Sequence, residues 1–387
     1  MRAVASEDRV GVDEDGVDAQ SSSSEEDIYI AGDDAAPVVA RHRRHRVGCI
    51  ADRPSPSRGA PAAGCAGPVL RGGDSAPDGF TERPRVSKKG EAHNSVRKLV
   101  HAVRMDQYRR GELVFDVIDE GPADGPVVVL LHGFPQFNTS WSTVIPRLTA
   151  RGYRCVAPNQ RGYSPGARPT RRRDYRTTEL VGDVEALIDA LGADRVHLVG
   201  HDWGAALAWA LAEELPERIA TLTALSVPHP GAFLKGLVTT RQCLQSWYIY
   251  AFQLPWVPER VLLGKGRSGK GLSYLFLQRY LNQTPDAANR DAAAMSAPGA
   301  LTAALNWYRA IPLSDLRRAT GKIAVPTMYV WSDGDSAVAA KPARDTARYV
   351  TGEYRFEVMH GVSHWLLDER PDAAADLMLE WLAAHPI

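Results

Sequence analysis

Apolar positions in residues 99–387 follow two patterns. Glu112 to Asp119 alternates apolar and polar side chains, as a half-buried strand does, whereas Val127 to Leu131 is continuously apolar, as expected for a strand buried on both faces. Further strands are predicted at Tyr153 to Ala157, Val196 to Val199, Ala220 to Leu225, Thr327 to Trp331 and Tyr354 to Val358. Helical periodicity fills the intervals, most clearly at 180–191 and 205–215. This alternation predicts an α/β architecture, a mostly parallel sheet with helices on both faces.

One long segment interrupts the alternation. From Pro228 to about residue 318 the chain is rich in Trp and Tyr, is helical in pattern and has no clear strand. We expect a helical cap at 228–318, inserted after the sixth strand. It divides the predicted core into a first part at 99–227 and a second part at 319–387.

Residues 1–98 have a different composition. Of the eight Phe, nine Trp and 13 Tyr residues of the chain, this segment holds only Tyr29 and Phe80. It cannot bury enough apolar surface to offset the entropy of ordering, which predicts a disordered, low-complexity tail. Its acidic and basic blocks leave an interaction tail open as an interpretation. Met105, just before the first predicted strand, is an alternative start of translation.

Charge and cysteine content narrow the class of protein. Lys plus Arg equals Asp plus Glu at 46 each, so no global field favours nucleic acid or an anionic membrane as partner. The four cysteines form no CxxC pair, and the histidines show no HExxH spacing, so neither a disulfide framework nor a metal site is expected. No apolar run is long enough to span a bilayer. We expect a cytoplasmic protein; its oligomeric state does not follow from the sequence.

The motif Gly200–Gly204, sequence GHDWG, lies between a predicted strand and an Ala-rich helix. Glycines two before and two after a central residue allow a sharp turn that exposes a nucleophile above a sheet, the nucleophile elbow. The central residue is Asp202. A carboxylate that attacks saturated carbon gives an ordinary ester that water can cleave, so the pattern predicts a substrate with a leaving group on saturated carbon. The plainer alternative is a helix-capping aspartate.

An ester on Asp202 needs a base and an acid that orients the base. His364 follows the last predicted strand and is the candidate base, whereas His360 at the strand end is interpreted as structural. Asp335 follows the strand before it and is the candidate acid, with Asp333 as its competitor.

Hydrolysis of that ester also needs donors for a tetrahedral oxyanion. The sequence His132-Gly133-Phe134-Pro135 follows the strand Val127 to Leu131. We expect the backbone N–H of Phe134, beside that of Trp203, to form the oxyanion hole.

Together these residues resemble the α/β-hydrolase-fold epoxide hydrolases over residues 99–387. The matching motifs are the elbow, HGFP at 132–135, Arg161-Gly162-Tyr163-Ser164 and His364-Trp365. The resemblance implies the α/β-hydrolase fold and a hydrolase that opens an epoxide to a vicinal diol through an ester on Asp202. Its partners would be a small-molecule epoxide and water, without a cofactor. Ser363 stands where many members of the family have Gly.

The resemblance also implies two cap tyrosines that donate hydrogen bonds to the epoxide oxygen. Asn306–Arg309 resembles the family's second tyrosine motif and nominates Tyr308; Trp247–Gln253 resembles the first and nominates Tyr248. Weaker candidates for the first tyrosine are Tyr250, Tyr274 and Tyr280. Four bulky cap residues predict an apolar substrate-binding pocket, or alternatively the core of the cap: Trp247, Trp256, Phe276 and Trp307.

Two other functions remain open. A haloalkane dehalogenase resembles this chain in the Trp that follows the nucleophile, Trp203, but it needs only weak donors for halide, whereas Tyr248 and Tyr308 suit an alkoxide. A catalytically silent binding protein of the same fold normally lacks a member of the triad, and this chain has all three candidates.

Overall fold

The computed structural model describes residues 104–264, 274, 276–280, 282–315 and 320–387. The predicted tail at 1–98 lies outside the described residues, so its predicted disorder stays a prediction.

In the described part of the chain, eight strands form one sheet in the order β1-β2-β4-β3-β5-β6-β7-β8. The strands are β1 Gln107–Arg110, β2 Leu113–Glu120, β3 Val127–Leu131, β4 Arg154–Pro158, β5 Val196–His201, β6 Ile219–Leu225, β7 Thr327–Ser332 and β8 Tyr354–Met359. β1 pairs antiparallel with β2, and β2 pairs antiparallel with β4. All other neighbours are parallel. The predicted α/β architecture is therefore confirmed.

The predicted strands are present, with ends that shift by one or two residues. β5 continues to His201, which brings the strand up to the central residue of the elbow. The strand β1 was not predicted, because three of its four residues are polar and only Tyr108 is buried. Such an edge strand lacks the alternation that marks a half-buried strand.

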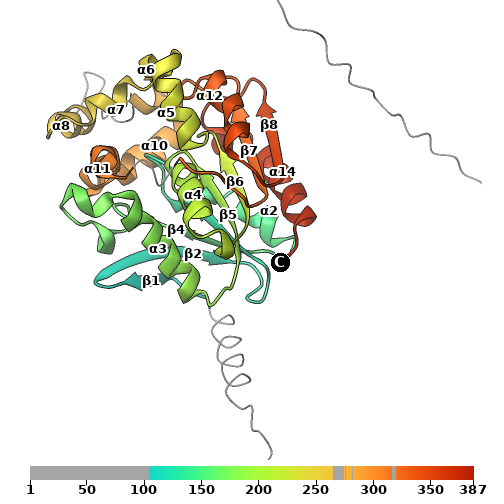
Figure 1. Ribbon diagram of the computed structural model, residues 1–387. Coiled ribbons are helices and arrows are strands. Elements are labelled where there is room, and N and C mark those ends of the chain that lie inside the picture. Colours follow the sequence, from blue (N-terminus) through green and yellow to red (C-terminus); the bar gives the residue numbers. More distant parts are fainter. Residues whose placement is uncertain (1–103, 265–273, 275, 281, 316–319) are drawn as a thin grey trace, which may run out of the picture. The chain divides into compact units, whose positions relative to one another are not determined.

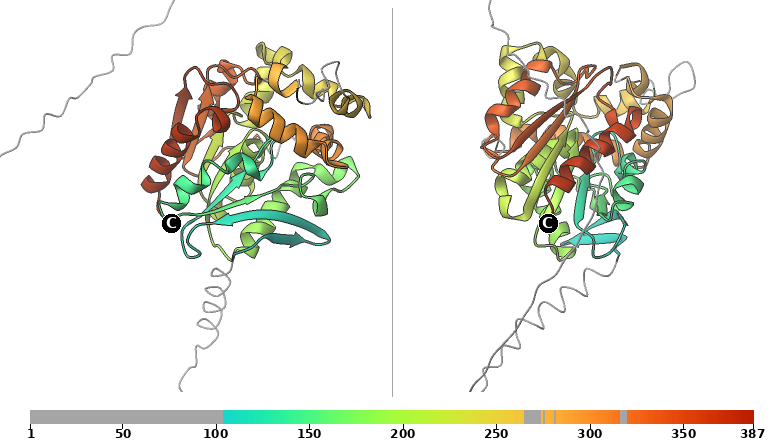
Figure 2. Two further views of the ribbon diagram at one scale, coloured as in Figure 1. Left: turned by 180° about the vertical axis from the view of Figure 1, so that it is seen from behind. Right: turned by 90° about the vertical axis from the view of Figure 1, so that its right-hand side faces the viewer.

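Helices cover both faces of the sheet (Figures 1 and 2). The core helices are α2 Ile145–Thr149, α3 Thr177–Ala190, α4 Trp203–Glu214, α12 Ala340–Asp345, α13 Leu366–Glu369 and α14 Pro371–Ala384. Side chains of α3 and α4 belong to the hydrophobic cluster on one face, and side chains of α2 and α14 to the cluster on the other. Because the central strands contact both clusters, β3 and β5 are buried along their whole length.

A helical insertion separates β6 from β7 (Figure 1). It contains α5 Pro230–Thr239, α6 Gln242–Gln245, α7 Trp247–Ala251, α8 Val257–Leu263, a π-helical turn Phe276–Tyr280, α10 Pro285–Met295 and α11 Ala300–Ala310. Several of these helices are only one or two turns long, so their stability comes from tertiary packing and not from helix propensity.

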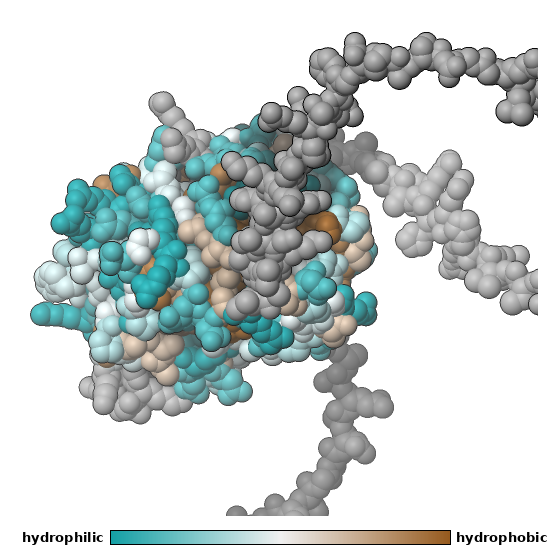
Figure 3. All heavy atoms as spheres, turned by 90° about the horizontal axis from the view of Figure 1, so that it is seen from below, coloured by the Kyte–Doolittle hydropathy of each residue, from teal (hydrophilic) through white to brown (hydrophobic). Residues whose placement is uncertain are grey.

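Large apolar side chains are exposed mainly on this insertion. Among the described residues they are Val238, Leu244, Trp247, Tyr250, Leu254, Trp256, Val261, Leu263 and Leu313, with Ile387 as the example outside it. On the face seen from below, in Figure 3, hydrophilic residues are interspersed with hydrophobic areas where the residues drawn in grey do not cover it. The exposed large apolar side chains of the described residues thus lie mainly on the insertion that follows the carboxyl end of β6, and α/β proteins place their ligands at that end of the sheet.

Candidate active site

The turn between β5 and α4 has the geometry of a nucleophile elbow. Asp202 has φ 51° and ψ −119°, a conformation that costs a non-glycine residue free energy and that surrounding contacts must hold. A Cβ on Gly200 would lie 2.3 Å from the Gly204 carbonyl oxygen, and one on Gly204 would lie 2.1 Å from the Leu131 carbonyl oxygen. Both glycines are therefore required by close backbone approach, and the turn lifts the Asp202 side chain above the sheet.

Three side chains that the sequence nominated form a chain of contacts. His364 Nε2 lies 3.3 Å from Asp202 Oδ2, and His364 Nδ1 lies 2.8 Å from Asp335 Oδ2. The side chain of Asp335 is fully buried, and its Oδ1 accepts hydrogen bonds from the amides of Ala337 (2.7 Å) and Val338 (3.0 Å). Asp335 is therefore fixed in position and orients the imidazole of His364 towards Asp202.

Asp333 and His360 form a separate pair. Asp333 Oδ2 lies 2.7 Å from His360 Nδ1, and Asp333 Oδ1 accepts a hydrogen bond from the amide of Gly361. The His360 side chain is 81% exposed. Of the two candidate acids, Asp335 is thus the one in contact with His364.

The predicted oxyanion loop meets the Asp202 carboxylate. The amide of Phe134 donates a 2.8 Å hydrogen bond to Asp202 Oδ1. A Cβ on Gly133 would lie 2.4 Å from the Asp202 Cβ, so only glycine allows this approach. Trp203, the second predicted donor, is the first residue of α4, and N–H groups in a first turn have no acceptor within the helix.

His132 supports the same loop. Burial lowers its pKa to about 4, so the ring is neutral near pH 7. Nε2 accepts a hydrogen bond from the Gln160 amide, which leaves Nδ1 to donate to the Gly133 carbonyl oxygen at 3.0 Å.

Opposing effects set the charges of the central pair. Burial lowers the pKa of His364, but the charges of Asp335 and Asp202 and their hydrogen bonds outweigh it and raise the pKa to about 10. Burial likewise raises the pKa of Asp202, but its hydrogen bond to His364 and the charge of His364 bring it below the ordinary value. The resting site therefore holds a carboxylate beside an imidazolium.

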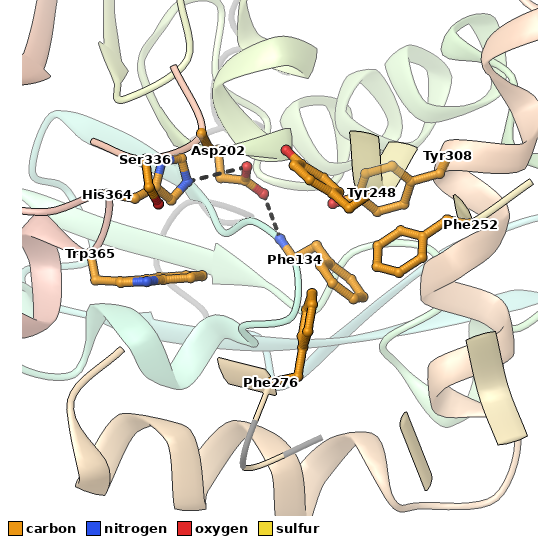
Figure 4. Close-up of a pocket in the computed structure, with 10 residues that line it drawn as sticks. Phe134, Asp202, Tyr248, Phe252, Phe276, Tyr308, Ser336, His364 and Trp365 are labelled. Atoms are coloured by element: carbon orange, nitrogen blue, oxygen red, sulfur yellow. Dashed lines mark hydrogen bonds and ion pairs between the residues drawn. The ribbon is translucent and has the colours of Figure 1, made fainter. Parts of the chain in front are cut away.

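Both nominated tyrosines reach the site from the insertion. In Figure 4, Asp202 lies between His364 and the side chains of Tyr248 and Tyr308. The rings of the two tyrosines, from α7 and α11, lie 6.1 Å apart between centroids, and the Tyr308 ring lies 5.0 Å from that of Trp203. Burial and then the charge of Asp202 raise the pKa of Tyr308 well above its ordinary value. Tyr308 is therefore a hydroxyl donor and not a tyrosinate.

The other nominated aromatics are placed differently. Trp307 is buried, lines a cavity beside Asp202 and donates from Nε1 to the Arg161 carbonyl oxygen at 2.7 Å. Trp247 is 45% exposed and is not among the described residues that line the cavities at Asp202. A direct role for Trp247 in substrate binding thus remains a sequence prediction without support from this geometry.

The alternative candidates for the first tyrosine are Tyr250, Tyr274 and Tyr280, and their surroundings differ from those of Tyr248. Tyr274 packs with Leu277 in a small separate cluster. Tyr250 lines the larger cavity but is 61% exposed. The side chain of Tyr280 lies outside the described residues.

Sequence reasoning missed a buried polar chain behind the site. His201 Nε2 donates to the His364 carbonyl oxygen at 3.0 Å, and its Nδ1 contacts Gln136 Oε1 at 3.1 Å. Gln136 Nε2 in turn donates to Asp368 Oδ2 at 2.8 Å. The available signal was position: Gln136 follows HGFP, and His201 precedes the nucleophile.

Arg309 and Gln253 were missed as supports of Tyr308. Arg309 makes two hydrogen bonds to Glu259, of 2.7 and 2.9 Å, and also donates to the Phe252 carbonyl oxygen. Gln253 Nε2 donates to the Tyr308 carbonyl oxygen at 2.8 Å. These bonds join α11 to α7 and α8 and so fix the two tyrosines relative to each other.

No group of three or more His, Cys, Asp or Glu side chains among the described residues is arranged to hold a metal ion. None of the helices there combines the length and the apolar character needed to cross a membrane.

Comparisons with known proteins agree with this fold. A family model described as the alpha/beta hydrolase fold matches residues 126–371. The AB hydrolase superfamily protein YfhM of Bacillus subtilis is 36% identical over 272 residues, which cover 70% of this chain and 94% of that protein. Epoxide hydrolase A of Mycobacterium tuberculosis is 30% identical over 305 residues, which cover 69% of this chain and 93% of that protein.

A solved structure also has this fold. The crystal structure of Epoxide Hydrolase A from Mycobacterium thermoresistibile matches with a TM-score of 0.64 and 25% identity, covering 73% of this chain and 98% of that one. The fold is thus that of the α/β hydrolases. The chain belongs to the α/β-hydrolase-fold epoxide hydrolase family and is a hydrolase.

Proposed function

We propose that this protein hydrolyses an epoxide to a vicinal diol through a covalent ester on Asp202. The observation that carries the proposal is the unbroken contact chain Asp202, His364, Asp335, with the hydroxyl-bearing Tyr248 and Tyr308 on the other side of the nucleophile. Relatives named epoxide hydrolases support the same reaction.

In the first step the Asp202 carboxylate attacks a ring carbon. Oδ1 lies in the proposed oxyanion hole, where the Phe134 amide binds it and where the carbonyl oxygen of the ester must lie, so we assign the attack to Oδ2. The new Oδ2–carbon bond forms as the ring carbon–oxygen bond breaks, and that electron pair stays on the ring oxygen. Tyr248 and Tyr308 donate hydrogen bonds to this oxygen, and one of them transfers its proton.

The alkylated enzyme has lost the negative charge of Asp202. That charge is one of the two that raise the pKa of His364, so the pKa falls in the ester. His364 then gives up its proton, which restores the tyrosine hydroxyl across the cavity that both side chains line. Esterification thereby converts His364 from an acid into a base.

In the second step neutral His364 removes a proton from water, and the hydroxide attacks the carbonyl carbon of the ester. The Phe134 amide stabilises the tetrahedral oxyanion, and Asp335 stabilises the imidazolium that forms. The ester carbon–oxygen bond then breaks, its electron pair stays on the leaving oxygen, and that oxygen takes the proton of the newly added hydroxyl by way of His364. The diol leaves, and the Asp202 carboxylate remains beside protonated His364. Epoxide plus water gives diol, and every proton is accounted for.

The test is to trap the ester. We expect His364→Gln, incubated with styrene oxide, to accumulate a mass increase of one styrene oxide on the peptide that contains Asp202, because alkylation proceeds and hydrolysis does not. His360→Gln is the matched control, since that exposed histidine pairs with Asp333. It should turn over styrene oxide like the native chain and accumulate no adduct.

Two results would contradict the proposal. An unmodified Asp202 peptide in His364→Gln, with a substrate that the native chain turns over, would exclude the covalent step. Faster release of bromide from 1-bromohexane than formation of diol from styrene oxide by the native chain would assign the site to dehalogenation instead.

A further inference from the structure

Asp202 lies at the junction of two cavities of very different size. One has a volume of about 270 Å³ and the other of about 20 Å³. Both are lined by the same five residues, which include all the proposed reacting groups except Asp335: Asp202, Tyr248, Tyr308, Ala337 and His364. A ring held between Asp202 and the tyrosines therefore has one large and one small space beside it.

The larger cavity has an apolar wall. Leu207 of α4, Phe233 and Leu237 of α5 and Ile249 of α7 line it, and Asp202 and His364 are the only ionisable acid and base among its described lining residues apart from tyrosines. An ionised group placed there would lose its hydration without gaining a counter-ion. The cavity thus favours an uncharged, apolar chain.

Aromatic rings form most of the wall of the smaller cavity. Phe134, Phe252, Phe276 and Trp365 line it (Figure 4). Ring centroids lie 5.7 Å apart for Phe134 and Phe252 and 6.4 Å apart for Phe252 and Phe276, so the rings pack against one another. A volume of about 20 Å³ admits roughly one water-sized group.

We propose that the substrates are epoxides with one uncharged, apolar arm on one ring carbon and at most a methyl group on the other. This inference rests on the proposed function and adds a substrate class to it. The reacting groups fix the ring at the junction, so the two ring substituents must enter the two cavities. A substituent longer than a methyl group would overlap the aromatic wall of the smaller one.

Three isomers with the same number of carbons separate the size of each arm from overall hydrophobicity. We expect kcat/KM for 1,2-epoxyoctane and for 2,3-epoxyoctane to agree within about tenfold, because a methyl group fits the smaller cavity. For trans-4,5-epoxyoctane, which has a propyl group on each ring carbon, we expect kcat/KM to be lower by roughly 10²-fold or more. Similar values for all three isomers would overturn the inference.

Two variants test which cavity excludes the second propyl group of trans-4,5-epoxyoctane. Phe276→Ala opens the smaller cavity and should raise kcat/KM for trans-4,5-epoxyoctane relative to 1,2-epoxyoctane by about tenfold or more. Leu237→Ala is the matched control, because it enlarges only the larger cavity and should not raise kcat/KM for trans-4,5-epoxyoctane itself. An equal rise in kcat/KM for trans-4,5-epoxyoctane in both variants would contradict the assignment of the smaller arm.

The charge of the arm is tested separately. 7,8-Epoxyoctanoate should react at least about tenfold more slowly than its methyl ester, since its carboxylate would enter the apolar cavity. Equal rates would overturn the uncharged part of the proposal. Failure of the proposed function looks different: no diol forms from any of these epoxides, and His364→Gln carries no adduct.

Discussion

His364 contacts two carboxylates, and the proposed reaction neutralises only one of them. Asp335 is buried and takes no part in bond making, whereas Asp202 is converted to a neutral ester. The His364 imidazole therefore has a high pKa in the free enzyme. It has a lower pKa in the ester intermediate, where it must accept a proton from water. Ester hydrolysis should consequently slow at low pH, where His364 in the ester is protonated, and accelerate as pH rises.

The first prediction concerns this change in pKa. In Asp202→Asn the carboxylate charge is absent, so the pKa of His364 should fall from the native value of about 10. NMR titration of the His364 ring measures both values. Asp333→Asn serves as control, because Asp333 pairs with His360, and it should leave the pKa of His364 as in the native chain. An unchanged His364 pKa in Asp202→Asn would show that Asp335 alone sets it.

At the scale of elements, a partly buried ionic contact joins the insertion to α13, which follows the proposed base His364. Arg290 of α10 lies 3.0 Å from Asp368 Oδ1 in α13 and 2.8 Å from Asp291 Oδ1. Asp291 is fully buried, and Asp368 also accepts a hydrogen bond from Gln136 on the oxyanion loop. One guanidinium therefore neutralises two carboxylates and connects α10 to both loops that surround Asp202.

Removing this guanidinium should be costly. We expect Arg290→Met to lower the free energy of unfolding by roughly 3 kcal/mol, because two largely buried carboxylates lose their cation. Arg147→Met is the matched control: Arg147 also bridges two carboxylates, Asp372 and Asp376, but these are largely exposed, so the change should lower the free energy of unfolding much less than Arg290→Met does. Denaturant unfolding measures both. Equal losses for the two variants would mean that the Arg290 contact is no stronger than a surface pair.

The sequence predicted the residues that follow strands better than the residues of the short cap helices. Strand patterns and the position of a residue after a strand placed Asp202, Asp335 and His364 correctly, because the carboxyl ends of neighbouring parallel strands lie together. The walls of the smaller cavity were not predictable as a set. Phe252 and Phe276 come from short helices and a π-helical turn that have no period of their own, so only tertiary packing brings their rings together.

At the scale of the whole molecule, one buried ion pair connects the strands of the sheet to the start of the described chain. Arg154 makes two hydrogen bonds to Asp119, of 2.9 and 2.6 Å, and both side chains are only 1% exposed. Asp119 also accepts a 3.0 Å hydrogen bond from the amide of Met105. The backbone just before β1 is thus attached to a buried ion pair between β2 and β4.

This attachment predicts different outcomes for two shortened chains. A chain that begins at Lys98 lacks almost all of a segment that is poor in core-forming residues, keeps the Met105 amide and should unfold and turn over epoxide like the full chain. A chain that begins at Gln107 loses the Met105 hydrogen bond to Asp119 and also the 2.8 Å bond from the Val117 amide to the Asp106 carbonyl oxygen. It should be less stable by at least about 2 kcal/mol, the usual value for a single bond to a charged group. Denaturant unfolding and diol formation compare the three chains.

If the chain from Lys98 unfolds more easily or loses activity, residues before Lys98 stabilise the hydrolase, contrary to the prediction from their composition. If the chain from Gln107 is as stable as the full chain, the Met105 and Asp106 contacts contribute nothing, and the pairing of β1 with β2 and its ion pairs with α3 are enough to hold it.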